Sequence, residues 1–510
     1  MAPTATGSSS QASSSKASTS KMGAASPSSA PSAAAPPVHR NFASLHLSPA
    51  LLRALSHLAL TVPTPIQSLT IPTILSGSDL IGGSPTGTGK TLCFALPILH
   101  SLVQDPVGGH SLILTPTREL ALQLYEQFLA LAQGARMGIK ISLVLGGMDM
   151  MKQATELAHG RPHIVVATPG RLWDLLRSGG QQEWGLDRCK FLVLDEADRL
   201  LTQTFAEALN YIMGVLPSSE KRQTLLFSAT LTKEIEVLAE KRLAEAKEGK
   251  GRGIKVEKIE FDAKTPKNLR QRYIFVPTHV REVYLYHLLT HPPSDRRSHR
   301  VGGSKRKALS GAVESLIEGE QGDEEDFGTQ VGEEEDEDEE ERVPPTIIFV
   351  SRCQSAELLT RTLRELSLPA ISLHSHLSQP TRLANLQKFR RDPARHILVA
   401  TDVASRGLDI PQVEMVINFD LPLAWEDYLH RVGRTARAGK VGWALSFVGE
   451  RDVTVLQGTE AKIGLQLREL EFPEERVLRM LGSVGSAKRV ASMEMADGGF
   501  GEKERRNKEK

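Results

Sequence analysis

The chain alternates short apolar runs with amphipathic stretches in a rhythm that repeats over most of its length. Between residues 79 and 230, each run rich in leucine or β-branched residues is followed at once by small, polar or charged residues. The runs are DLIGG, SLIL, ISLVL, HIVVA, FLVL and TLLF, and they lead into SPTGTGKT, TPTREL, GG, TPGR, DEAD and SAT. Stretches such as 118–132 between them have helical amphipathic spacing. Buried strands that alternate with helices predict a parallel sheet with helices on both faces.

The same rhythm begins again after residue 345. There the runs TIIFV, AISL, HILVA, MVINF and ALSFV lead into SRC, HSH, TDVASRG, DLP and GERD. The chain has 510 residues, more than the ~250–300 that one hydrophobic core usually serves. We therefore expect an α/β protein with two tandem domains, at residues 41–245 and 268–483. Ligands of such sheets bind at the carboxyl ends of the strands, so all these polar motifs predict one cleft.

Four segments do not fit the rhythm. We expect a disordered Ser/Ala/Pro tail over residues 1–40 and a linker over 246–267. Residues 291–343 contain a basic stretch and then EEEDEDEEE at 333–341, and predict a disordered insertion in a surface loop of the second domain. Residues 484–510 read as a polar C-terminal tail.

Composition limits the possible partners and cellular compartment of the protein. The formal net charge of +1 conceals a basic remainder outside the nine acids at 333–341, which permits a polyanionic partner. The three cysteines, Cys93, Cys189 and Cys353, are far apart, which argues against a zinc site or disulfide framework and favours a reducing intracellular compartment. No apolar run reaches the ~18 residues of a membrane span, so no membrane association is expected. A mitochondrial transit peptide is a weaker alternative, because the first arginine is Arg40.

Residues 84–91, SPTGTGKT, follow a predicted strand and precede a predicted helix, the context of a phosphate-binding loop. Gly87 and Gly89 would let backbone N–H groups close on phosphate oxygens. Lys90 would reach the outer phosphates, and the Thr91 hydroxyl would bind Mg²⁺. The strict motif has glycine where Ser84 stands, and a glycine-rich turn with an incidental lysine is the alternative.

The tetrapeptide DEAD follows the predicted strand FLVL. Asp195 is placed for the shell of Mg²⁺, and Glu196 is placed to orient or deprotonate an attacking water. A solvated acidic loop is the alternative for the tetrapeptide alone.

Several motifs occur in one order: PTPIQ, GTGKT, PTREL, GG, TPGR, DEAD, SAT, ATDVASRGLD and HRVGRTAR. That order, over about residues 42–450, resembles the DEAD-box ATP-dependent RNA helicases. In that family two RecA-like domains close over ATP and one RNA strand. The resemblance implies an RNA-stimulated ATPase, active as a monomer, that uses ATP and Mg²⁺.

The resemblance implies a role for each matching residue. Those of the ATP site are Phe42, Gln67, Ser84, Pro85, Thr86, Gly87, Thr88, Gly89, Lys90, Thr91 and Asp409, with Thr91 and Asp195 holding Mg²⁺. Catalysis is assigned to Lys90, Asp195, Glu196 and the arginine fingers Arg434 and Arg437. Coupling between nucleotide and domain closure is assigned to Asp198, Ser228, Thr230 and His430. Arg431 is expected to make a structural ion pair.

Each role has a plainer alternative. Phe42 could be a core aromatic, Ser228 and Thr230 could be helix caps, and Asp409 could be a turn residue. The arginines at 431–437 could form a solvated basic helix end.

RNA contacts implied by the resemblance come from both domains. They are Pro116, Thr117, Arg118, Gly147, Thr168, Gly170 and Arg171, then Ser375, Gln379, Arg382, Thr401 and Arg406. Most are small, hydroxyl or arginine residues, which suit phosphate and ribose contacts that carry no sequence information. Each of them could instead be a turn or cap residue.

The chain departs from the family pattern at Ala59–Leu60, at Ser84 in place of alanine, and at LHS (373–375) in place of LHG. The segments GGSPTGTGKT and LHSHLSQ are similar to the branch that acts in small (40S) ribosomal subunit maturation. This predicts pre-rRNA or an associated small RNA and pre-ribosomal proteins as partners, 18S rRNA processing as the pathway, and a nuclear, nucleolar location. Short basic pieces at 305–307 and 503–510 permit nuclear import.

Three other functions stay open at this point. The chain could be an ATP-gated RNA clamp that unwinds little, an RNA helicase of another pathway such as splicing or translation, or a DNA translocase. Gln67 and the DEAD tetrapeptide argue against the last. The acidic run could compete with RNA for basic surfaces, could dock basic ribosomal proteins, or could be a solvated spacer.

Overall fold

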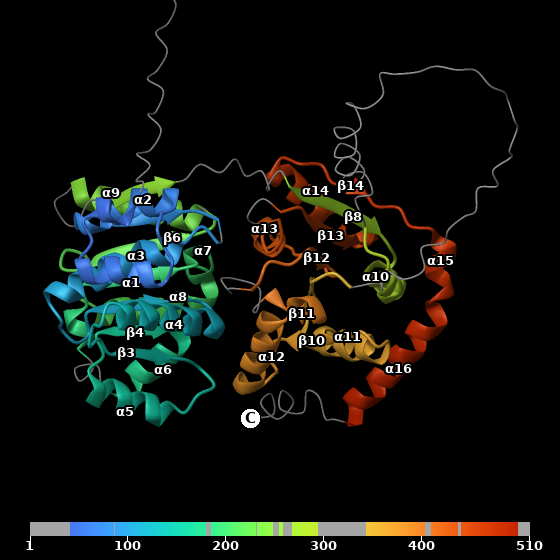
Figure 1. The fold of residues 1–510 in the computed structure, drawn as a ribbon, viewed down its shortest axis with the longest axis horizontal. Helices are drawn as coiled ribbons and strands as arrows, with labels where there is room; N and C mark the ends of the chain where they lie inside the picture. The colour runs from blue at the N-terminus through green and yellow to red at the C-terminus, as the bar shows by residue number, and fades with distance from the viewer. Residues whose placement is uncertain are drawn as a thin grey trace, which may run out of the picture. The chain divides into compact units, whose positions relative to one another are not determined.

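The structure, a computed structural model, describes residues 41–85, 87–179, 185–230, 232–247, 254–258, 268–293, 343–402, 410–436 and 440–497. Two seven-stranded sheets, all of whose pairs are parallel, organise these residues (Figure 1). The order is β3-β4-β2-β5-β6-β1-β7 in the first sheet and β10-β11-β9-β12-β13-β8-β14 in the second. The predicted α/β fold with two tandem parallel sheets is therefore confirmed.

The first sheet contains every apolar run predicted as a strand in the first half of the chain. Its strands are β1 (Asp79–Gly83), β2 (Ser111–Leu114), β3 (Ile141–Val144), β4 (Ile164–Ala167), β5 (Phe191–Asp195), β6 (Gln223–Ser228) and β7 (Ile254–Lys258). Its helices are η1 (Phe42–Leu45), α1 (Pro49–His57), α2 (Pro65–Leu75), α3 (Lys90–Gln104), α4 (Arg118–Gly134), α5 (Met150–Gly160), α6 (Pro169–Arg177), η2 (Leu186–Arg188), α7 (Ala197–Leu200), α8 (Gln203–Val215) and α9 (Lys233–Lys247).

Two apolar cores cover the two faces of this sheet because successive strand residues point to opposite sides. Leu80 faces one core and Ile81 the other, and Leu225 and Leu226 divide in the same way. α1 to α4 close the first core, whereas α5 to α9 close the second. A continuous apolar run therefore reads as a strand buried on both faces.

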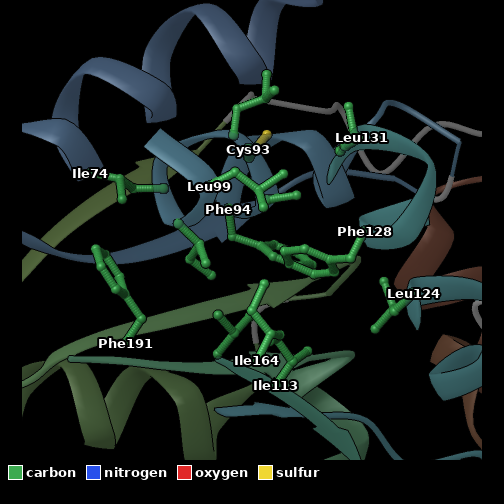
Figure 2. Close-up of a cluster of buried hydrophobic side chains, with 14 of the residues drawn as sticks. Ile74, Cys93, Phe94, Leu99, Ile113, Leu124, Phe128, Leu131, Ile164 and Phe191 are labelled. Carbon is green, nitrogen blue, oxygen red and sulfur yellow. The ribbon is translucent and has the colours of Figure 1, made fainter. Parts of the chain in front are cut away.

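Phe94 of α3 lies at the centre of the first core (Figure 2). Its ring centroid is 6.1 Å from that of Phe128 and 5.3 Å from that of Phe227, and all three rings are fully buried. These contacts pack α3, and with it the loop that precedes it, against α4 and β6.

The second sheet has the same plan. Its strands are β8 (Leu269–Phe275), β9 (Thr346–Phe349), β10 (Ala370–Leu373), β11 (Ile397–Ala400), β12 (Met415–Asn418), β13 (Gly442–Val448) and β14 (Arg468–Glu469). Its helices are η3 (Thr278–Val280), α10 (Arg281–Thr290), α11 (Cys353–Glu365), α12 (Gln379–Arg391), η4 (Pro393–Arg395), α13 (Trp425–Val432), η6 (Glu450–Asp452), α14 (Val453–Ile463), α15 (Glu474–Arg479) and α16 (Leu481–Asp497).

The structure differs from two predicted boundaries. β7 lies inside the predicted linker and pairs with β1, with Asp79 opposite Ile254, so it is an edge strand of the first sheet. This strand was not predicted from the sequence because the segment is rich in lysine and glutamate. The predicted polar tail from residue 484 is helical as far as Asp497, because Val484, Ala487, Ala491 and Met495 of α16 are buried. Residues 1–40 and residues 294–342 of the predicted insertion lie outside the described residues.

Long apolar helices are missing from the described part of the chain: no helix there has both the length and the apolar character that a membrane crossing requires.

Replacing Phe94 with alanine is expected to lower the free energy of unfolding by about 3–5 kcal/mol, because it leaves a cavity beside the rings of Phe128 and Phe227. Denaturant unfolding of the full chain measures this change. Met151→Ala is the matched control, since that side chain is 75% exposed, and should change stability by less than about 0.5 kcal/mol. Equal unfolding midpoints for the two variants would contradict the central role of Phe94.

Candidate active site

The phosphate loop begins where β1 ends and finishes at the first turn of α3. Gly89 is the N-cap residue of α3 with φ +86°, and a Cβ there would lie 2.3 Å from Gln67 Nε2. Only glycine suits both the left-handed conformation and this close approach. Lys90 Nζ donates a hydrogen bond to the Ser84 carbonyl oxygen at 2.8 Å, and the side chain is only 7% exposed. The loop thus curls around its own lysine.

Ser84, one of the departures from the family pattern, has a hydrogen-bond partner for its hydroxyl within this loop. Its Oγ hydrogen-bonds with the Thr88 hydroxyl, and Thr88 Oγ1 donates to the Pro85 carbonyl oxygen at 2.8 Å. A buried hydroxyl costs stability unless it is hydrogen-bonded, and here it is. Thr86 lies outside the described residues.

Gln67 joins the start of α2 to the phosphate loop. Its Nε2 donates to the Gly89 carbonyl oxygen at 3.0 Å, while its Oε1 accepts from the Thr64 backbone N–H at 2.9 Å. Phe42 lies in the first core and is 4% exposed. This burial agrees with the alternative interpretation of Phe42 as a core aromatic. Recognition of adenine by these two residues stays a prediction.

The DEAD acids lie at the end of β5 beside the loop. Asp195 is the last residue of the strand, and Glu196 follows it in a left-handed conformation with φ +52°. That conformation is uncommon for a residue with a Cβ and is typical of functional sites. Burial, and next the Glu196 carboxylate, raise the pKa of Asp195, while Lys90 opposes the shift.

Mg²⁺ fits the side chains at this position. Thr91 is the second residue of α3, directly after Lys90, and Asp195 is a buried carboxylate whose proton a divalent cation would displace. Hydroxyl and carboxylate oxygens are the ligands that Mg²⁺ prefers. The donor set therefore agrees with the predicted pair Thr91 and Asp195.

A hydrogen-bond chain leads away from the acids. Thr230 Oγ1 donates to Asp198 Oδ2 at 2.7 Å, and the Thr230 N–H donates to Ser228 Oγ at 3.2 Å. His430 Nε2 lies 3.7 Å from Glu196 Oε2 and 4.0 Å from Asp198 Oδ2. The four residues assigned to coupling are thus brought together with Glu196.

Glu196, Asp198 and His430 could also hold a metal ion, since one ligand atom of each lies within 4.8 Å of the others. We prefer a hydrogen-bond network, because Asp198 already accepts from Thr230 Oγ1 and from the Arg199 N–H at 3.0 Å. An imidazole is also a poor ligand for Mg²⁺.

Arg431 in the last turn of α13 and Arg434 just after that helix are both buried. Arg431 makes the ion pair expected of it: its Nε and Nη2 each lie 2.6 Å from an Asp402 carboxylate oxygen. Its Nη1 donates to the Asp420 carbonyl oxygen at 2.7 Å. Arg434 is 1% exposed, so a solvated helix end is the wrong description of both residues. Arg437 and Asp409 lie outside the described residues, and the finger role of Arg434 stays a prediction.

The predicted RNA residues of the first domain gather at the starts of α4 and α6. The Arg118 guanidinium lies against Gly147, where a Cβ would come within 2.5 Å of Nη1. Arg171 Nη1 donates to the Met148 carbonyl oxygen at 2.8 Å. Thr117 caps α4, because its hydroxyl accepts from the Leu120 N–H at 3.3 Å. Thr168 is the N-cap residue of α6, Pro169 and Gly170 form its first turn, and Pro116 precedes Thr117.

The second domain brings its RNA residues to β10, α12 and the end of β11. Arg382 Nη2 lies 2.7 Å from Glu119 Oε1, and Gln379 Nε2 donates to the same oxygen at 3.3 Å. Ser375 is exposed and Thr401 is 4% exposed. Arg406 lies outside the described residues.

Sequence reasoning missed Glu119 and Asp402 as partners of these arginines. Glu119 belongs to PTREL and follows residues assigned to RNA binding. A carboxylate among basic RNA-binding residues could have indicated an ion pair with one of the arginines. Asp402 offered none, because an acid after a strand is common.

Comparison with known proteins shows the family of this chain. The family model described as DEAD/DEAH box helicase matches residues 64–238, and the model described as helicase conserved C-terminal domain matches residues 331–439. The chain is 54% identical over 485 residues to "ATP-dependent RNA helicase DBP8" of Mycosarcoma maydis, covering 93% of this chain and 90% of that protein. It is 46% identical over 474 residues to the dbp8 helicase of Schizosaccharomyces pombe, covering 92% of each. The chain belongs to the DEAD-box family of RNA helicases.

Solved helicase structures share its fold. Mss116p bound to single-stranded RNA and AMP-PNP superposes with a TM-score of 0.67 at 26% identity, covering 87% of this chain and 81% of that one. Dbp5 of S. cerevisiae bound to RNA and ADP BeF3 gives a TM-score of 0.63 at 24% identity over 88% of this chain and all of that one, which concerns the fold alone.

The raised pKa of Asp195 predicts a pH dependence of stability for this helicase. In the folded state Asp195 keeps its proton at pH values above the ordinary aspartate pKa of about 4, whereas the unfolded state loses it. The free energy of unfolding of the wild type therefore falls as pH rises beyond that value, while that of Asp195→Asn has no such contribution. Without nucleotide or Mg²⁺, we expect the asparagine variant to melt higher at neutral pH, and the difference to shrink toward pH ~4.5.

Thermal melting over this pH range measures the difference. Asp187→Asn is the control, because Asp187 is exposed. A difference that grows on acidification would show that the folded state favours the Asp195 carboxylate instead.

Proposed function

We propose that this RNA helicase couples ATP hydrolysis to local separation of short RNA duplexes, or to ribonucleoprotein remodelling, in the precursor of the small ribosomal subunit. The ordered motifs and the DBP8 relatives support an ATP-hydrolysing RNA helicase. Support for the pathway comes from the GGSPTGTGKT and LHSHLSQ segments, which are similar to the branch that acts there. A nuclear, nucleolar location follows from the same proposal.

The ATP site uses side chains at the carboxyl edge of the first sheet. Lys90 would exchange its bond to the Ser84 carbonyl for the outer phosphates, and the loop N–H groups would bind their oxygens. When bound by Thr91 and Asp195, Mg²⁺ neutralises charge on the phosphates. Gln67, whose side chain is hydrogen-bonded to Gly89 of this loop, would form hydrogen bonds with the edge of the adenine base.

Glu196 is the proposed general base. Its carboxylate lies next to the metal ligand Asp195 and is 2% exposed, so it would orient a single water and accept its proton. Arg434 and Arg437 would supply positive charge as phosphoryl transfer proceeds, a contribution of about 10³–10⁵ in rate for such arginines.

One observation carries this mechanism: His430 lies within 4.0 Å of both Glu196 and Asp198, and Asp198 is bonded to Thr230. A residue of α13, a helix of the second domain, thereby contacts the proposed base. Movement of His430 would change the surroundings of Glu196, which links the state of the nucleotide to the grip of the second domain on RNA.

The RNA side of the cleft would hold a single strand by phosphate and ribose. Arg118, Arg171 and Arg382 supply charge, while the hydroxyls of Thr117 and Ser375 suit ribose contacts. Arg382 forms an ion pair with Glu119 in the described structure. An RNA phosphate would therefore compete with the Glu119 carboxylate for the Arg382 guanidinium.

Glu196→Gln is expected to keep nucleotide binding and to lower RNA-stimulated ATP turnover by roughly 10²–10⁴-fold, because the amide cannot accept the proton of the attacking water. Fluorescent-nucleotide titration and phosphate release measure the two quantities. Glu207→Gln, an exposed change on α8, serves as the control and should leave both unchanged. Full turnover in Glu196→Gln would overturn the assignment of the base.

Crosslinking the helicase to RNA in cells and sequencing the footprint tests the pathway. We expect reads concentrated on the small-subunit rRNA precursor or an RNA paired with it, and accumulation of 18S precursors when the protein is depleted. Footprints confined to spliceosomal RNA or messenger RNA would reject the ribosomal role while leaving the helicase activity intact.

A further inference from the structure

A second cluster of reactive side chains lies outside the ATP site, where β10 ends and α11 begins. Cys353 is the first residue of α11, His374 and Ser375 follow β10, and Glu357 lies one turn into α11. Cys353 Sγ is 3.1 Å from Ser375 Oγ, and the neighbouring His374 side chain acts electrostatically on the thiol. His374 Nε2 lies 3.3 Å from Glu357 Oε2. The three side chains form a thiol, imidazole and carboxylate series.

The carboxylate end of the series is firmly held. Glu357 Oε1 accepts from Arg361 Nε at 2.8 Å, and Glu357 Oε2 accepts from Ser372 Oγ at 3.2 Å. The His374 side chain is fully buried, with 0% exposure. A buried imidazole between a carboxylate and a thiol has the arrangement that activates a sulfur nucleophile.

Electrostatics favour the thiolate. The neighbouring His374 side chain lowers the pKa of Cys353 to about 6, in spite of partial burial. Burial alone would lower the pKa of His374, but its interactions with Cys353 and Glu357 outweigh burial and raise it. The charged groups that face the thiol from neighbouring elements are His374, His376 and Arg382. The start of the thirteen-residue helix α11 adds positive potential.

The other two cysteines supply an internal contrast. Cys93 and Cys189 are buried, and burial raises the pKa of each to about 12. Cys353 is partly exposed beside exposed Ser375 and His376. Of the three thiols, only Cys353 combines access with a partner that stabilises the thiolate.

We propose that Cys353 is a modification site for small disulfides of the glutathione class, and that the adduct obstructs RNA binding by the second domain. The first half rests on the Cys353–Ser375 and His374–Glu357 contacts and on the partial exposure of Cys353, and does not depend on the proposed RNA function. The second half rests on the proposed RNA function, because Ser375, which the sulfur contacts, and Arg382 are assigned to RNA.

The chemistry is a thiol–disulfide exchange. The Cys353 thiolate attacks one sulfur of the incoming disulfide, an Sγ–S bond forms, and the original S–S bond breaks. The electron pair leaves with the second sulfur, which takes a proton from the His374 imidazolium or from water. Cys353 is oxidised to a mixed disulfide, half of the small disulfide is reduced to a thiol, and an added thiol reverses the step.

Site selectivity is the first test. Full-length native protein is treated with oxidised glutathione, and intact-mass and peptide mass spectrometry count the adducts and place them. We expect a single adduct, on Cys353, that dithiothreitol removes. Equal or preferential modification of Cys93 or Cys189 in the folded protein overturns the proposal.

The role of the imidazole is tested by rate. At pH ~6 a thiol with a pKa near 6 is half ionised, and after correction for its lower nucleophilicity it should react about tenfold faster than an ordinary cysteine. Stopped-flow reaction with the aromatic disulfide dithiodipyridine should therefore slow about tenfold in His374→Gln. Glu357→Gln keeps the imidazole and should slow the reaction by less. Rates equal to wild type in both variants overturn the role of the cluster.

The effect on RNA is measured with the singly modified protein. Affinity for single-stranded RNA should fall about tenfold or more, as for the loss of a charge-assisted contact, and should recover with dithiothreitol. Cys353→Ser should bind RNA as untreated wild type does and should not respond to the disulfide. Unchanged affinity after modification overturns the obstruction. Untreated wild type that binds no RNA would instead overturn the proposed function, while the labelling rates still decide the reactivity of the thiol.

Discussion

Parallel pairing of buried strands is the constraint on which the rest of this structure depends. All pairs in both sheets run the same way, so every strand of a sheet ends at the same edge. Beyond that edge the chain has no neighbouring strand to pair with and continues as loops, where polar side chains and glycines are tolerated. The phosphate loop after β1, the acids after β5 and Ser228 at the end of β6 become neighbours for this reason, although the chain separates them widely.

Burial then gives these neighbours their chemistry. Asp195, Glu196 and Asp198 are each at most 7% exposed, and three carboxylates so close together would repel one another without compensating groups. Lys90, Thr230 and His430 supply that compensation from three other elements. The same principle operates at the second sheet, where His374 is stabilised by Glu357 on one side and by Cys353 on the other. Charge held in a buried network responds strongly to any ligand that adds or removes a charge.

Much of this arrangement could be predicted. Apolar runs at 79–83, 191–194 and 346–350 are strands because their residues are buried on both faces, and the motifs after them lie where a parallel sheet places them. The ion pair of Arg431 was also predictable, since a buried guanidinium needs a partner. The edge strand β7 was not, because an edge strand can be charged and carries no apolar signal. Helix α16 was missed because its buried face consists mainly of alanine and valine in a polar sequence.

The order of motifs along the chain therefore determined the fold, the family and the identity of the residues at the cleft, since these depend on residue type and local spacing. Tertiary structure decided which side chains are partners: Glu119 with Arg382, Asp402 with Arg431, His430 with Glu196, and His374 with Cys353. Partnership depends on distances between elements remote in the chain. The pKa of a buried group depends on its partners and its desolvation, and neither is written in the residues adjacent to it.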